Sequence, residues 1–171
     1  MLLLLDVGNT NTVVGIHDGN TLLHTWRIAT DKNKTADEYF VLLNSLFITK
    51  QLDITIISDV IISSVVPIVT QTMCWLTENQ LQKPLLLVSD QSITNISILL
   101  DDPATIGADL LVAAAAVFSK YKKTAIIVDL GTATTLTVVT DKGEFLGGSI
   151  VAGVEVSLQK LFDTTANLSQ M

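Results

Sequence analysis

The chain contains 171 residues, of which 49% are hydrophobic and 16% charged, and its formal net charge is −7. This composition excludes a disordered or collagen-like chain, and the acidic balance argues against a protein that binds nucleic acid or an anionic membrane. The single cysteine, Cys74, excludes an internal disulfide and a thiolate metal cage, and it fits a reducing cytoplasm.

The first elements expected along the chain are three short strands joined by two glycine-containing turns. The apolar runs 1–5, 12–16 and 21–28 are separated by Asp6-Val7-Gly8-Asn9-Thr10 and by His17-Asp18-Gly19-Asn20. Such turns between apolar runs predict an antiparallel meander. The first run lacks a basic start and is interrupted by Asp6, so it is interpreted as a buried strand rather than a signal segment.

Helices and strands are expected to alternate after the meander. Thr35-Ala36-Asp37-Glu38 has the pattern of a capping box and precedes apolar residues at helical spacing. The β-branched run 54–66 predicts a buried strand, and Pro67 suits the first position of a helix whose apolar face carries Ile68, Thr72, Trp75 and Leu76. A strand at 85–88 and an alanine-rich helix at 110–121 follow.

The second half of the chain repeats the order of the first. Strands are expected at 124–128, 135–139 and 144–151, and a helix at 154–162. A shift of 123 positions places Asp6 on Asp129, Gly8 on Gly131, Asn9 on Thr132, Thr12 on Thr135 and Asp18 on Asp141. Two such segments, each between apolar strands, indicate an internal duplication.

The two repeated turns have residues suited to binding phosphate. Glycine at the bend lets backbone N–H groups approach an anion, and neighbouring hydroxyl and amide groups add hydrogen-bond donors. Asp6 and Asp129 cannot bind phosphate directly, but they suit a cation that neutralises its charge. Two such turns facing one cleft would hold a polyphosphate, which predicts phosphoryl transfer. The alternative is two tight hairpins whose Asp and Thr side chains serve only local turn bonds.

The paired turns resemble the phosphate motifs of the acetate kinase/sugar kinase/Hsp70/actin superfamily. Further segments resemble, in one order along nearly the whole chain, those of type III pantothenate kinase. They are Asp6-Val7-Gly8-Asn9-Thr10-Asn11, Ile62-Ser63-Ser64-Val65-Val66-Pro67, Gly107-Ala108-Asp109, Val128-Asp129-Leu130-Gly131-Thr132-Ala133-Thr134-Thr135 and Gly147-Gly148-Ser149-Ile150. The resemblance implies an α/β fold with two ribonuclease-H-like (actin-like ATPase) domains of mixed sheets and helices, residues 1–122 and an incomplete second domain at 123–171.

The resemblance also implies the residues of the site. ATP phosphates are expected on Asp6, Val7, Gly8, Asn9, Thr10, Asn11, Thr12 and Val13, with a further nucleotide contact at Thr132. Pantothenate is expected at Gly107, Ala108, Asp109 and Leu110, with Asp109 as the proton acceptor. Asp129 matches a ligand of a monovalent cation (K⁺ or NH₄⁺). The family also implies Mg²⁺ with ATP, a homodimer and a cytoplasmic location.

The activity expected from the resemblance is ATP-dependent phosphorylation of pantothenate to 4'-phosphopantothenate, the first step of coenzyme A biosynthesis. The chain departs from the family pattern at Leu110, where the family has arginine, at Leu100, where it has tyrosine, and at Ala152, where it has proline. Because the changes at Leu110 and Leu100 remove substrate contacts and the second domain is expected to be incomplete, the main alternative is a pseudo-kinase that binds nucleotide or dimerises without turnover. Another phosphotransferase of the superfamily, such as a sugar kinase, is a third hypothesis.

Overall fold

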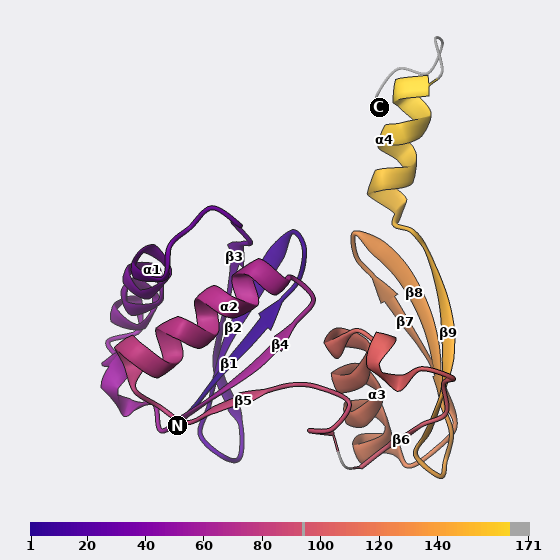
Figure 1. Cartoon of the computed structure of the whole chain (residues 1–171), viewed down its shortest axis with the longest axis horizontal. Helices are drawn as coiled ribbons and strands as arrows, with labels where there is room; N and C mark the ends of the chain where they lie inside the picture. Colours follow the sequence, from indigo (N-terminus) through magenta and orange to yellow (C-terminus); the bar gives the residue numbers. More distant parts are fainter. Residues whose placement is uncertain (94, 165–171) are drawn as a thin grey trace. The chain divides into compact units, whose positions relative to one another are not determined.

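The computed structural model (Figure 1) describes residues 1–93 and 95–164. These residues form an α/β fold with two mixed sheets, and the chain divides into two compact units. Unit 1 comprises residues 1–92 and 106–112, and unit 2 comprises residues 93–105 and 113–171.

Unit 1 is built on a five-stranded sheet of order β3-β2-β1-β4-β5. The strands are β1 (Leu2–Val7), β2 (Asn11–His17), β3 (Leu22–Ala29), β4 (Asp59–Ser64) and β5 (Leu85–Leu87). The first three pair antiparallel, which confirms the predicted meander, and β4 pairs parallel with both β1 and β5. The carboxyl ends of β1 and β4 therefore meet at one edge of the sheet.

Two helices, α1 (Ala36–Thr49) and α2 (Pro67–Leu76), pack on one face of this sheet (Figure 1). Alternate residues of β1 and β4, such as Leu5 and Ile62, enter the same core as Tyr39 and Phe47 of α1. Because side chains alternate across a strand, the intervening residues of β1 and β4 lie on the opposite face. That second face carries Asp6.

Two sequence predictions in this unit were wrong. Residues 54–66 do not form one strand, because Asp53 accepts a hydrogen bond from the N–H of Thr55 (2.8 Å) and starts a 3₁₀ turn over Ile54–Ile56. The second prediction was wrong only in part: the helix from Pro67 is confirmed and Leu76 is buried with Val69 and Met73, whereas Ile68 and Trp75 are about half exposed. The helix has two apolar stripes, and spacing alone does not tell which one meets the sheet.

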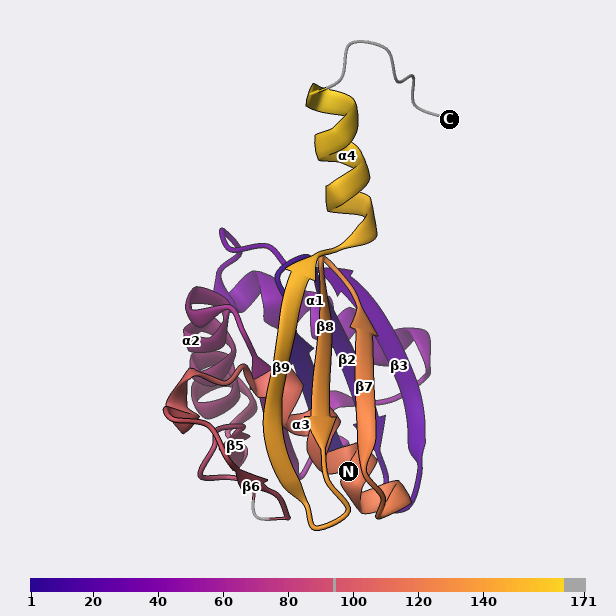
Figure 2. The same cartoon turned by 90° about the vertical axis from the view of Figure 1, so that its right-hand side faces the viewer.

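Unit 2 is built on a four-stranded sheet of order β6-β9-β8-β7. Figure 2 shows its three long strands, β7 (Ala125–Leu130), β8 (Ala133–Val139) and β9 (Glu144–Ala152), side by side. They form a second antiparallel meander, and the short β6 (Ser97–Ile98), which the sequence did not predict, pairs parallel with β9. Helix α3 (Ala108–Tyr121) begins in unit 1 and continues in unit 2 from Ala113, and α4 (Val154–Thr164) follows β9.

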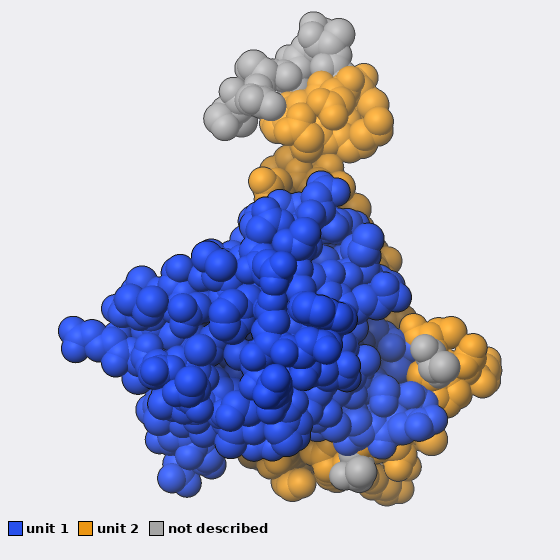
Figure 3. Space-filling view, turned by 60° about the vertical axis from the view of Figure 1, so that its left-hand side comes forward, with its two compact units in different colours: residues 1–92, 106–112 blue, residues 93–105, 113–171 orange. Residues whose placement is uncertain are grey.

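Each of the two units is made of two separate segments of the chain, so no single boundary divides them (Figure 3). Residues 93–105 group with unit 2 although they precede α3, and residues 106–112 group with unit 1. The predicted domain boundary between residues 122 and 123 stays a prediction. Residues 165–171 of the predicted second domain lie outside the described residues.

The predicted duplication is confirmed by the two meanders, with one correction. Strand β7 follows β1 by 123 positions at both ends. After the turn the ladder pairs Thr12 with Val7 but Thr134 with Leu130, so the counterpart of Thr12 by register is Thr134 rather than Thr135. The reason is a shorter second turn, in which the N–H of Gly131 bonds to Ala133, whereas that of Gly8 bonds to Asn11.

The two repeats differ in what covers them. Leu3, Leu5 and Val7 of β1 are buried under α1 and α2. The residues 123 positions later in β7 are exposed by 69%, 55% and 73%; they are Ile126, Val128 and Leu130. An apolar sheet face in unit 2 is thus open to solvent.

None of the described helices is long and apolar enough to cross a membrane.

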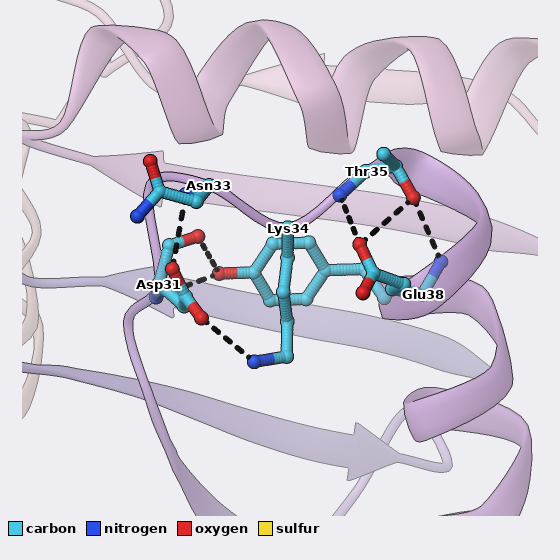
Figure 4. Close-up of polar contacts among 6 residues, drawn as sticks. Asp31, Asn33, Lys34, Thr35 and Glu38 are labelled. Atoms are coloured by element: carbon cyan, nitrogen blue, oxygen red, sulfur yellow. Dashed lines mark hydrogen bonds and ion pairs between the residues drawn. The ribbon is translucent and has the colours of Figure 1, made fainter.

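The loop from β3 into α1 is a network of short polar contacts (Figure 4). The predicted capping box is confirmed, since the N–H of Thr35 donates to Glu38 (2.8 Å) and the N–H of Glu38 donates to the Thr35 hydroxyl (3.3 Å). The buried Tyr39 hydroxyl donates to the backbone C=O of Asp31 (2.9 Å). Lys34 forms an ion pair with the Asp31 carboxylate (2.9 Å).

This loop makes the stability of unit 1 dependent on pH. The N–H of Thr35 holds the pKa of Glu38 below its usual value, so the folded state favours the carboxylate. The resulting stabilisation exists above the unfolded-state pKa, roughly 4.3, and is lost as the pH falls through the lower folded-state value. We expect Glu38→Gln to melt below the wild type at pH 7 and to converge with it in acid, measured by circular dichroism. A melting difference that stays constant down to pH 2.5 would contradict this account.

Candidate active site

The turn between β1 and β2 is a tight bend whose glycine N–H is used inside the turn. The N–H of Gly8 donates to the C=O of Asn11 (3.0 Å), which closes the turn. A Cβ on Gly8 would lie 3.1 Å from that same oxygen, so a larger residue would crowd the bend. Asn9 and Thr10 at the tip are exposed, as is Asp6 at the end of β1. The turn therefore presents polar groups to solvent at the carboxyl end of the central strand.

A residue that the sequence analysis missed, Thr30, holds this turn from the end of β3. Its N–H donates to the C=O of Thr10 (2.9 Å), and its hydroxyl donates to the C=O of Gly8 (2.8 Å). Since that single hydroxyl proton is used on Gly8, the Thr12 hydroxyl donates to the oxygen of Thr30 (2.8 Å). Thr12 is fully buried, so its side chain supports the turn from inside. No local sequence pattern links Thr30 to a turn some 20 residues away.

The start of α3 lies in the same unit as this turn. The position of a Cβ on Gly107 would be 3.5 Å from Cγ1 of Val65, and the N–H of Val65 donates to the C=O of Val7 (3.1 Å). Gly107 therefore lies next to Val65, which is hydrogen-bonded to the strand end from which the Gly8 turn begins. The predicted ATP-phosphate and pantothenate segments thus belong to the same unit, and their joint role in one site stays a prediction.

The carboxylate of Asp109 has a defined place at the first turn of α3. Its Oδ1 accepts a hydrogen bond from the N–H of Leu110 (2.8 Å). A side chain on Gly107 would collide with that same oxygen, so the glycine leaves room for the carboxylate. Asp109 is half-buried. A carboxylate held in this way is suited to accept a proton from a nearby hydroxyl group.

The second repeated turn lies in unit 2. The N–H of Gly131 donates to the C=O of Ala133 (3.0 Å), and the N–H of Gly153 donates to the C=O of Thr132 (3.0 Å). A Cβ on Gly153 would clash with the carbonyl oxygen of Gly131, so the end of β9 packs closely on the turn. Asp129 and Thr132 are both exposed. That the turns at Gly8 and Gly131 face one crevice stays a prediction.

The two leucines that depart from the family pattern are both half-buried. Leu100 is half-buried in unit 2, where its Cδ2 would be 2.9 Å from a Cβ on Gly147 of β9. Leu110 is half-buried in the first turn of α3. Neither leucine can supply the hydrogen bonds of the tyrosine or arginine expected there.

The donor set fits a divalent cation that arrives with phosphate. No cluster of three or more His, Cys, Asp or Glu side chains that could hold a metal ion occurs among residues 1–93 and 95–164. Mg²⁺ at phosphoryl-transfer sites is commonly bound through one or two carboxylates, with phosphate oxygens and water completing its shell. Asp6 beside the Gly8 turn meets that requirement.

His17 and Cys74 are not part of such a site. The Nδ1 of His17 accepts the N–H of Gly19 (2.9 Å), and burial raises the pKa of the Cys74 thiol.

Comparisons with known proteins identify the family of the chain. A family model described as type III pantothenate kinase matches residues 2–171. Type III pantothenate kinases from Desulforapulum autotrophicum, Syntrophus aciditrophicus and Geobacter sulfurreducens are 42%, 43% and 44% identical over the whole chain. The chain spans 66% of the length of the first and 67% of the other two, about two thirds.

Solved structures support the fold. A conserved candidate Baf-family transcriptional activator from Campylobacter jejuni superposes with a TM-score of 0.59 at 16% identity, over 98% of this chain and 63% of its own. A candidate 2-dehydro-3-deoxygalactonokinase from Sinorhizobium meliloti gives 0.54 at 14% identity, over 99% and 57%. At these identities the superpositions show a shared architecture, and they confirm the predicted actin-like ATPase fold class.

Proposed function

Since the chain belongs to the type III pantothenate kinase family, we propose that it transfers the γ-phosphoryl group of ATP to the primary hydroxyl of pantothenate, yielding 4'-phosphopantothenate and ADP. One structural observation carries the proposal beyond family membership. It is the position of Gly107, two residues before Asp109, beside Val65, whose N–H bonds to the strand end from which the Gly8 turn begins; this position supports a shared site. Phosphoryl transfer depends mainly on such positioning and on charge neutralisation.

The proposed roles are those that the family resemblance implies, and the local structure of each segment supports them. Residues 6–13 form the phosphate-binding turn, in which the exposed Asn9, Thr10 and half-buried Asn11 supply donors and Thr12 supports the bend. Asp109 takes the proton from the pantothenate hydroxyl, whose oxygen then bonds to the γ-phosphorus as the bond to ADP breaks. Residues 107–110 line the pantothenate side, and Gly107 keeps space for the carboxylate.

Cations and assembly complete the proposal. Mg²⁺ bound with ATP would neutralise phosphate charge and would be held through Asp6. Asp129 would bind K⁺ or NH₄⁺ and Thr132 would contact the nucleotide, since both are exposed at the second turn. A homodimer is proposed from the family resemblance, and a cytoplasmic location from the single cysteine, which fits a reducing compartment.

The kinase is favoured over the alternative of a pseudo-kinase, because the relatives matched along the whole chain are pantothenate kinases at 42–44% identity. A coupled ADP-release assay with ATP, Mg²⁺ and K⁺ tests the choice. We expect ADP release only when pantothenate is present. Binding of ATP without turnover, measured by calorimetry under the same conditions, would support the pseudo-kinase, and release with a hexose instead of pantothenate would support a sugar kinase.

A further inference from the structure

Two adjacent serines end strand β4, and only one of them has a structural explanation. The hydroxyl of Ser64 lies 2.6 Å from that of Thr70 and accepts the N–H of Val66 (3.2 Å). It therefore joins the end of the strand to the start of α2. Removing this hydroxyl would disturb the fold of unit 1 locally.

Ser63 has no comparable local role. It is only 7% exposed, and its hydroxyl oxygen is buried without a hydrogen-bond partner among the described residues. Buried polar groups are almost always paired in folded proteins, because leaving one unpaired weakens the fold. An unpaired hydroxyl that persists in a core-forming strand suggests a partner that arrives from outside the chain.

The position of Ser63 indicates what that partner is. In the parallel ladder Ser63 pairs with Asp6, and its neighbour Ile62 points to the helix-covered core. Because side chains alternate along a strand, Ser63 lies on the same face as Asp6. That face adjoins the Gly8 turn and the Val65 contact with Gly107. Since a serine hydroxyl is neutral and can donate, it suits a phosphate oxygen next to a carboxylate that holds a cation.

We infer that Ser63 is a ligand-binding residue that donates a hydrogen bond to a phosphate oxygen of Mg²⁺-ATP at the Gly8 turn. The inference rests on the proposed function, which supplies the nucleotide. It adds a donor from β4 to a turn built from β1 and β2. The same geometry explains why the hydroxyl persists, since its hydrogen bond forms only in the complex.

The test compares Ser63→Ala with Ser64→Ala in the otherwise unchanged protein. Calorimetric titration would measure the affinities for Mg²⁺-ATP and for pantothenate separately, and circular dichroism would measure the melting temperature. For Ser63→Ala we expect about tenfold weaker Mg²⁺-ATP binding, unchanged pantothenate binding and a melting temperature equal to or above that of the wild type. For Ser64→Ala we expect a lower melting temperature and unchanged Mg²⁺-ATP affinity.

The outcomes separate this inference from the function on which it rests. If the wild type binds Mg²⁺-ATP and Ser63→Ala binds it equally well, the inference is wrong and the kinase proposal stands. Weaker pantothenate binding by Ser63→Ala, or a lower melting temperature than that of the wild type, would also overturn the inference. A wild type that binds no Mg²⁺-ATP would overturn both.

Discussion

Asp109→Asn is expected to lower kcat for pantothenate phosphorylation by about 10²- to 10⁴-fold, because the amide cannot accept the proton of the attacking hydroxyl. The change is nearly isosteric. The amide oxygen can still accept the N–H of Leu110, which the carboxylate accepts at 2.8 Å. Folding and ATP binding should therefore be preserved, and the loss should fall on the chemical step. Single-turnover formation of 4'-phosphopantothenate measures it directly.

A matched control is Asp141→Asn, which removes one exposed carboxylate from the turn between β8 and β9. It makes the same change in charge at a residue that has no proposed role in the site, and it should leave turnover unchanged. If Asp109→Asn turns over at the wild-type rate while both variants remain folded, Asp109 is not the proton acceptor. That result would leave the family assignment unchanged, but it would show that another group accepts the proton.

Thr30→Val is expected to weaken Mg²⁺-ATP binding by about 10- to 100-fold, since a displacement of about 1 Å in a positioning group can have an effect of that size. Valine keeps the shape of threonine but leaves the buried Thr12 hydroxyl and the Gly8 carbonyl without the partner that holds the turn. The unpaired Thr12 hydroxyl should also reduce the free energy of unfolding by about 1–3 kcal/mol. Calorimetric titration and urea unfolding measure the two effects.

The control for this substitution is Thr25→Val, at an exposed position of β3, the strand that ends one residue before Thr30. It introduces the same β-branched apolar side chain without touching the turn. Equal nucleotide affinity in Thr30→Val and Thr25→Val would show that the turn holds its shape without Thr30. A loss of unfolding free energy with unchanged affinity would limit Thr30 to a structural role.

Local patterns in the sequence predicted most elements of both units. The capping box at Thr35, Pro67 at the start of α2 and the glycine-containing turns each act over a few residues, so the chain order reveals them. The predicted strand at 54–66 was wrong because a single side chain, Asp53, stabilises a 3₁₀ turn within a β-branched run. Propensity summed over a window does not register such a bond.

The site was less predictable where it depends on contacts between distant segments. The repeated turns could be found by self-comparison, yet Thr30 and Ser63 matter only through pairing between strands that the sequence does not specify. The one-residue difference between the two turns likewise appears only in the ladder register. Residues 106–112 group with unit 1, where Gly107 lies next to Val65, a residue some 40 positions earlier in the chain.

The exposed apolar face of β7 should make the second meander less stable than the first. Burial of apolar surface is the main source of folding free energy, and Ile126, Val128 and Leu130 contribute far less of it than their buried counterparts Leu3, Leu5 and Val7. Amide protons of the second meander should accordingly exchange with deuterated water sooner than those of the first. Heating would then melt the molecule in two stages, with the meander that carries Asp129 lost while the Gly8 turn is still intact.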